Sequence, residues 1–204
     1  MYKSYILPKN LVLFISGVPG VGKTTISYEL LKKYPEFRLV EETDVIREIL
    51  RGYNDQLTSI HNFTPESIYA HDIFLSYEMA KQQCRIMRNS IINIVKRQQR
   101  KEIPSIINGV HIIPEELYAH LPNSNIIYLN LYIDSETALW NRLKMRNPEK
   151  YKSECVPFLY QTNVDLKNSL IRIQKLCKSY SINVSMSSIQ ETLLEIDKIF
   201  CNLY

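Results

Sequence analysis

The stretch of sequence that decides the fold is residues 11–31, which read LVLFISGVPGVGKTTISYELL. A run of apolar residues is followed by a glycine-rich segment that ends in lysine and threonine, and then by apolar residues at helical spacing. Three of the five glycines in the chain, Gly17, Gly20 and Gly22, fall within this segment. A strand, a loop and a helix in this order are the context in which the pattern G-x-x-x-x-G-K-T forms a phosphate-binding loop.

The physical basis of this loop is that a chain of phosphates is held by many backbone N–H groups, which only a loop poor in side chains can point inward. The helix that begins near Lys23 adds unpaired N–H groups and the positive end of its dipole. Lysine in this position reaches the β- and γ-phosphates, and the hydroxyl of Thr24 is placed to ligate Mg²⁺. The sequence therefore predicts binding of ATP with Mg²⁺. The expected binding residues are Gly17, Val18, Pro19, Gly20, Val21, Gly22, Lys23, Thr24 and Thr25.

Strand and helix patterns alternate along the rest of the chain. Further strands are predicted at residues 37–41, 104–109, 125–133 and 182–186, with helical patterns between and after them. This alternation predicts a three-layer α/β/α sandwich around a parallel sheet. Ligands of such a sheet bind at the carboxyl ends of its strands, which selects Asp44, Asn108 and Asp134 as polar residues on the phosphate-loop side.

Two apolar stripes define long helices. The first runs from Ile73 to Ile94, after a polar stretch at residues 52–65 that we interpret as a loop, and it indicates either core packing or a dimer seam. The second stripe comprises Leu166, Leu170, Ile173, Cys177 and Tyr180.

Composition predicts one globular domain over residues 1–204, with 45% hydrophobic and 23% charged residues. The net charge of +4 is too small for a nucleic-acid-binding protein, and no basic stripe is interleaved with aromatic residues. The four cysteines lie far apart in the sequence, which indicates a reducing compartment. No apolar stretch is long enough for a signal peptide or a membrane span. We therefore expect a cytoplasmic monomer or homodimer with no nucleic-acid or membrane partner.

A kinase needs a carboxylate near the acceptor hydroxyl and cations near the transferred phosphoryl group. Asp44 could accept the proton of that hydroxyl, although it could also be a helix N-cap. Arg47 and Arg51 are available to an acidic acceptor. Arg142 and Arg146 precede a polar stretch, which predicts a catalytic lid around residues 142–156; a solvated helix end is the alternative.

Three segments resemble a known family: residues 43–51 (TDVIREILR), residues 108–114 (NGVHIIP) and residues 163–174. Together with the phosphate loop they are similar to the P-loop kinases known as 2-phosphoglycerate kinases, over roughly residues 11–186. The resemblance implies a fold of the nucleoside-monophosphate-kinase type and ATP-dependent phosphorylation of 2-phosphoglycerate to 2,3-bisphosphoglycerate. It also implies that the acceptor side is lined by Asp44, Arg47, Gly109, Val110 and His111.

One position departs from the family pattern. An acidic residue usually precedes G-V-H, whereas this chain has Asn108. Mg²⁺ would then be coordinated by Thr24, the phosphates and a carboxylate elsewhere in the chain, such as Asp44 or Glu42. A kinase for a nucleoside, an antibiotic or a nucleotide sugar remains an alternative, and so does a nucleotide-binding regulatory module with little turnover. His111 could equally be a buried structural histidine.

Overall fold

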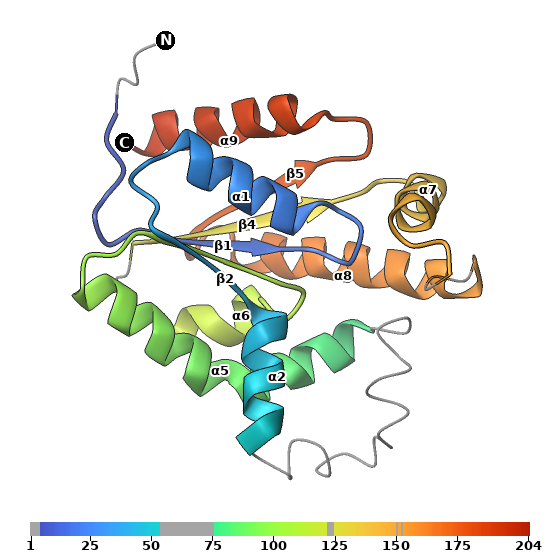
Figure 1. The fold of residues 1–204 in the computed structure, drawn as a ribbon, viewed down its shortest axis with the longest axis horizontal. Helices are drawn as coiled ribbons and strands as arrows, with labels where there is room; N and C mark the ends of the chain where they lie inside the picture. Colours follow the sequence, from blue (N-terminus) through green and yellow to red (C-terminus); the bar gives the residue numbers. More distant parts are fainter. Residues whose placement is uncertain (1–4, 54–75, 122–124, 150, 152) are drawn as a thin grey trace.

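The computed structural model describes residues 5–53, 76–121, 125–149, 151 and 153–204. Five parallel strands form one sheet in the order β2-β3-β1-β4-β5 (Figure 1). These strands are β1 (Val12–Ser16), β2 (Leu39–Glu42), β3 (Ser105–Asn108), β4 (Ile126–Tyr132) and β5 (Lys178–Asn183).

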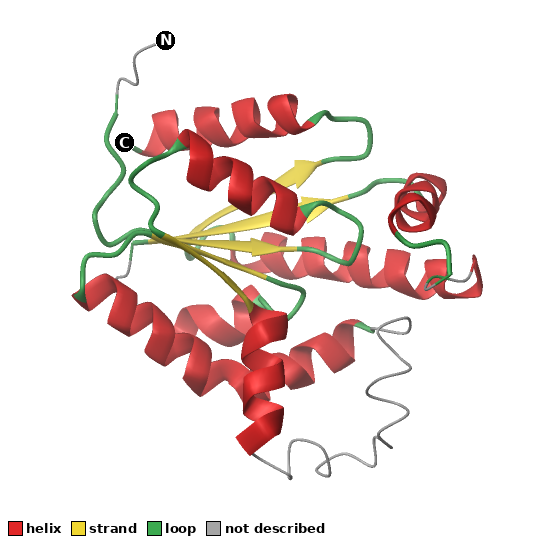
Figure 2. Cartoon of the chain, viewed as in Figure 1, coloured by secondary structure: helices red, strands yellow, loops and turns green. Residues whose placement is uncertain are grey.

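Helices cover both faces of this sheet (Figure 2). One face carries α1 (Lys23–Lys33) and α9 (Ile189–Leu203). The other carries α5 (Tyr77–Arg100), α6 (Pro114–Leu117) and α8 (Val156–Ile173). The helix α2 (Thr43–Tyr53) follows directly from the carboxyl end of β2, and three residues separate α7 (Glu136–Arg146) from the end of β4. Short 3-10 turns span Tyr118–His120 and Ser153–Cys155. The predicted three-layer α/β/α sandwich is confirmed.

The central strand explains why residues 11–16 are so apolar. All five residues of β1 are buried, because β3 and β4 flank it and helices cover both faces. The predicted stripe on α5 also lies in this core: Ala80, Cys84 and Ile91 are 0% exposed. Of the two interpretations of that stripe, packing within the chain is the one observed. Its first member, Ile73, and residues 54–65 of the expected loop lie outside the described residues, while residues 52–53 still belong to α2.

The last strand differs from the prediction. β5 begins at Lys178, not at residue 182, and α8 ends at Ile173, so Tyr180 belongs to the strand and not to the helical stripe. β5 is an edge strand that pairs with β4 alone, and only Ile182 in it is buried. Its sequence, KSYSIN, has only two apolar side chains that alternate with polar ones, Tyr180 and Ile182, and Tyr180 also continues the helical spacing of the preceding stripe.

A charged cluster joins α6 to its neighbours. Glu115 accepts hydrogen bonds from Tyr77 Oη and Lys81 Nζ, both at 2.7 Å, and its other oxygen lies 3.0 Å from Arg172 Nη2. Burial alone would raise the pKa of Glu115, but these three partners outweigh it and hold the pKa at about 2. The cluster ties the turn that follows β3 to α5 and α8. None of the helices in the described ranges combines the length and the apolar composition that a membrane crossing needs.

Candidate active site

The phosphate loop connects β1 to α1 at the carboxyl end of the central strand. Gly22 precedes the first turn of α1 in the left-handed conformation, with φ of 93°. A Cβ on Gly17, where φ is 145°, would lie 2.5 Å from the carbonyl oxygen of Leu131. Lys23 folds back over the loop and donates a hydrogen bond from Nζ to the carbonyl of Val18 at 3.0 Å. The glycines therefore allow a turn that other residues would strain.

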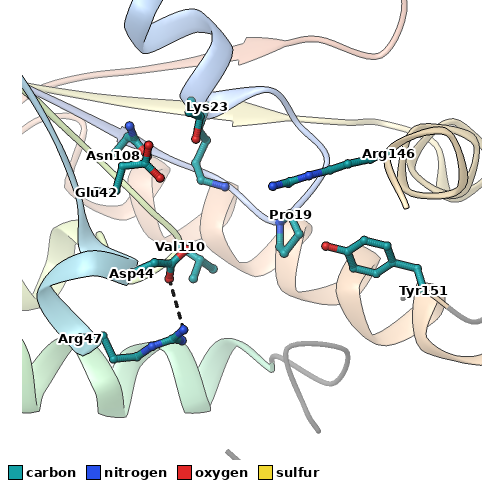
Figure 3. A pocket seen from close by; sticks show the side chains of 10 residues that line it. Pro19, Lys23, Glu42, Asp44, Arg47, Asn108, Val110, Arg146 and Tyr151 are labelled. Atoms are coloured by element: carbon teal, nitrogen blue, oxygen red, sulfur yellow. Dashed lines mark ion pairs between the residues drawn. The ribbon is translucent and has the colours of Figure 1, made fainter. Parts of the chain in front are cut away.

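A cavity of about 120 Å³ opens beside this loop (Figure 3). It is lined by Pro19, Lys23, Thr24, Glu42, Asp44, Arg47, Asn108, Val110, Arg146 and Tyr151. Lys23 and Arg146 point toward the middle of the cavity from the loop side and from α7, while Asp44 and Arg47 face them from α2. Three cations and two carboxylates thus meet in one small space, an arrangement suited to a charged ligand.

Lys23 has an altered acidity in this cavity. Burial lowers the pKa of its ammonium to about 8, and Arg146 acts in the same direction, while Asp44 and Glu42 oppose them. A triphosphate in the loop would add negative charge beside the ammonium and so favour its charged form.

The residues expected to handle magnesium lie on one side of the cavity. Thr24 is exposed at the loop, and Glu42 lies beside Asn108, its partner in the β2–β3 register. The Asn108 amide donates to Ser27 Oγ at 3.1 Å, and Ser27 donates to the carbonyl of Lys23 at 2.8 Å. Asn108 thus supports the first turn of α1. Thr24 and the carboxylate of Glu42 offer the oxygen ligands that Mg²⁺ prefers. In the described ranges, no group of three or more His, Cys, Asp or Glu side chains could hold a metal alone.

The residues expected on the acceptor side divide into two groups. Asp44, Arg47 and Val110 line the cavity, and Asp44 Oδ1 lies 3.7 Å from Arg47 Nη2. Behind them, His111 is fully buried, with Nδ1 2.9 Å from Thr43 Oγ1.

The remaining residues expected on the acceptor side are not among those that line the cavity. Gly109 packs against Thr43 so closely that a Cβ would lie 1.7 Å from Thr43 Oγ1. Arg51 pairs with Glu48 Oε1 at 2.7 Å, one turn further along α2. Asp134, also selected by its place after a strand, hydrogen-bonds to Ser185 and, at 2.6 Å, to Asn183. It joins the end of β4 to the end of β5.

A second cavity, of about 200 Å³, lies on the other side of the phosphate loop. It is lined by Val21, Gly22, Thr25, Ile26, Arg142, Val184, Ser187, Ile189 and Thr192. Arg142 donates to the carbonyl of Val184, and burial lowers the pKa of its guanidinium. The two arginines of α7 therefore serve different cavities, although their spacing places them on one helix face. Sequence reasoning missed the β5–α9 residues of this cavity and Tyr151 of the first; a correct β5 boundary would have indicated the former.

Comparisons with known proteins identify the family and the fold. The family model described as novel STAND NTPase 3 matches residues 4–131, which include the phosphate loop, α2 and the turn after β3. No curated protein sequence matches the chain. Solved structures do, and they share its fold at low sequence identity.

Three such structures are kinases. A gluconokinase from Sinorhizobium meliloti 1021 superposes with a TM-score of 0.58 at 14% identity, covering 97% of this chain and 95% of its own. A shikimate kinase from Acinetobacter baumannii gives 0.55 at 16% identity, covering 97% and 94%. A thymidylate kinase from Candida albicans gives 0.55 at 13% identity, covering 95% and 92%. The predicted P-loop kinase fold of the nucleoside-monophosphate-kinase type is thereby confirmed.

Proposed function

The chain belongs to the novel STAND NTPase 3 family, and we propose that it is an ATP-dependent kinase acting on a small anionic metabolite that carries a hydroxyl group. The observation that carries the proposal is the first cavity, where Lys23 and Arg146 face Asp44 and Arg47 across a small polar space (Figure 3). Phosphoryl transfer needs positioning and charge neutralisation, and these are the groups that supply both. Residues 1–204 would form one kinase domain.

The nucleotide would span both cavities. Its phosphates would lie in the loop of residues 17–25, on the backbone N–H groups at the start of α1. Its base would enter the second cavity, where Arg142 offers a planar cation and α9 offers Ile189. Bound Mg²⁺, held by Thr24 and Glu42, would neutralise charge on the β- and γ-phosphates.

The acceptor would lie in the cavity between the side formed by Asp44 and Arg47 and the side formed by Lys23 and Arg146. The Asp44 carboxylate takes the proton of the acceptor hydroxyl, whose oxygen forms a bond to the γ-phosphorus while the bond from that phosphorus to the β–γ bridging oxygen breaks. Lys23 and Arg146 neutralise the charge on the transferring group, and Arg47 holds the anionic group of the acceptor. Residues 142–156, with Tyr151 in the cavity wall, would act as the lid that excludes water.

The dimensions of the cavity favour a short acceptor. Pockets that enclose drug-sized ligands measure about 300–1,000 Å³, whereas this cavity measures about 120 Å³. A short acceptor is therefore the first kind to test, and a three-carbon phosphorylated acid would pair its charges with Arg47. We name 2-phosphoglycerate as the first acceptor to test, in agreement with the motif resemblance.

Incubation with Mg·ATP and a panel of phosphorylated and hydroxylated acids tests the proposal. We expect ADP to form only with an acceptor, with a new phosphate ester in the ³¹P NMR spectrum. Lys23→Ala should abolish transfer, while Lys32→Ala, which removes an exposed lysine paired to Glu29, should not. ADP release that is the same with every acceptor and without any would refute the kinase proposal.

A second function is favoured by one residue. Asn108 lines the cavity at the position where the 2-phosphoglycerate kinases, which this chain resembles, usually have an acidic residue. Its amide donates a hydrogen bond to Ser27 Oγ. A nucleotide-binding regulatory module would bind ATPγS tightly and yield no acceptor-dependent ADP, so calorimetry paired with the turnover assay separates the two functions.

A further inference from the structure

One buried imidazole lies close to three residues at the start of α2. His111 is 0% exposed. Its Nδ1 lies 2.9 Å from Thr43 Oγ1 and 3.7 Å from Asp44 Oδ1. Its Nε2 lies 3.5 Å from Arg47 Nη1. Because Asp44 and Arg47 line the cavity and His111 is enclosed behind them, the ring reaches the cavity only through these neighbours.

The far side of the ring is anchored to another helix. Nε2 of His111 forms a hydrogen bond with Oε1 of Gln83, which lies on α5. An amide oxygen only accepts, so Nε2 donates to Gln83, while the hydrogen bond between Nδ1 and the Thr43 hydroxyl can run in either direction. These two contacts hold the ring in one orientation, and through it α5 is connected to the start of α2.

Thr43 is held from a second direction. It is 0% exposed and lies against Gly109, where a Cβ would approach Thr43 Oγ1 to 1.7 Å and φ is 155°. Its hydroxyl can therefore occupy one place, between the backbone of Gly109 and the ring of His111. The first turn of α2 is fixed to the turn after β3 by these two contacts.

We propose that His111 is a positioning residue, which sets the places of Asp44 and Arg47 through Thr43 and does not touch the acceptor itself. This inference rests on the proposed function in one respect, that Asp44 and Arg47 are the groups that meet the acceptor. A displacement of about 1 Å in such groups can reduce the rate by about a hundredfold. Loss of the Thr43–His111 contact should therefore affect the acceptor and leave the nucleotide, which lies on the loop and α1, unaffected.

The test uses the full chain saturated with Mg·ATPγS and inorganic phosphate as the probe of the anion-binding group, measured by calorimetry. Thr43→Val removes the hydroxyl and keeps the shape, while Thr43→Ser keeps the hydroxyl. Thr162→Val is the matched control, because Thr162 is a buried threonine on α8 whose hydroxyl donates to the carbonyl of Phe158 at 2.9 Å, away from the cavity.

We expect Thr43→Val to weaken phosphate binding about tenfold or more, with unchanged ATPγS affinity. Thr43→Ser should recover most of the loss, and Thr162→Val should bind both ligands as the wild type does. Where an acceptor is found, its KM should rise in Thr43→Val while the KM for ATP stays constant. A merely structural role for the hydroxyl would lower the melting temperature and weaken both ligands together.

The inference is overturned if Thr43→Val binds phosphate like the wild type, if Thr43→Ser fails to restore binding, or if the wild type binds no phosphate. If Thr43→Val does not fold, His111→Asn and His111→Gln replace it. The asparagine amide lies near the place of Nδ1 and the glutamine amide near that of Nε2, so asparagine should preserve more phosphate affinity. Phosphate binding by a wild type that phosphorylates no acceptor would refute the kinase proposal alone.

Discussion

The acidity of Lys23 predicts how nucleotide affinity depends on pH. Burial and Arg146 hold the pKa of this ammonium at about 8 in the empty site. A bound triphosphate favours the charged form, so binding takes up a proton once the pH exceeds that value. The affinity for ATP should accordingly be constant below the pKa and fall above it.

The magnitude follows from the fraction of Lys23 that is charged. With a pKa of about 8, the ammonium is about nine-tenths protonated at pH 7 and about one-tenth protonated at pH 9. The apparent Kd should therefore rise about tenfold between these two pH values. A lysine with its ordinary pKa, about 10.4, would change the Kd by less than about 10% over the same range.

Calorimetry with Mg·ATPγS at saturating magnesium measures this dependence, because the thiophosphate stays fully ionised throughout. Lys23→Arg should bind with a flat pH profile, since a guanidinium stays charged. Lys32→Ala, which removes an exposed lysine of the same helix, should retain the wild-type profile. A wild-type Kd that stays constant up to pH 9 would refute the reasoning, and so would an equal decline in Lys23→Arg.

Three further predictions follow from single contacts. Arg142→Ala should weaken ATP binding about tenfold but leave the affinity for tripolyphosphate, which lacks a base, unchanged; titrations measure both affinities. Arg146→Ala should lower kcat about a hundredfold at an unchanged Kd for ATP, as steady-state kinetics and titration measure. Glu115 should stabilise the fold by about 2 kcal/mol above pH 4.5, and this stabilisation should be lost as the pH falls toward 2, because the pKa of Glu115 in the folded chain is about 2. Urea unfolding of the wild type and of Glu115→Gln, at pH 6 and near pH 3, shows whether the difference in their unfolding free energies shrinks at the lower pH. Gly109→Ala should cost about 2–3 kcal/mol and lower the Tm, while Gly52→Ala, with nothing within 4 Å of its Cβ, should not; equal Tm values would contradict the close packing at Gly109.

Much of the fold was predictable because its signals are local. The apolar run of β1 reflects burial on both faces of the sheet, and the stripe on α5 reflects one buried helix face. β5 could not be placed in the same way. Its position depends on backbone pairing with β4, a contact between distant segments, and its two apolar side chains, Tyr180 and Ile182, are too few to mark where the strand begins.

The site was predictable to a smaller extent. The phosphate loop is contiguous in sequence. Ligands of a parallel sheet bind at the carboxyl ends of its strands, and this rule correctly predicted that Asp44 and Asn108 lie at the cavity. The same rule selected Asp134, whose side chain turns instead to Asn183 and Ser185. Helical spacing placed Arg142 and Arg146 on one face, yet it could not show that the phosphate loop separates two cavities between them.

The order of the strands explains why two motifs more than sixty residues apart form one unit. β2 and β3 are neighbours, and their register pairs Glu42 with Asn108. The next residue on each strand is therefore Thr43 and Gly109, so these two must meet where the strands end. A threonine can turn its hydroxyl into this junction only because the opposite residue has no side chain. The segments TDVIRE and NGVH thus form the two sides of one contact. A substitution in either segment should displace Asp44 and Arg47 more than it displaces the phosphate loop.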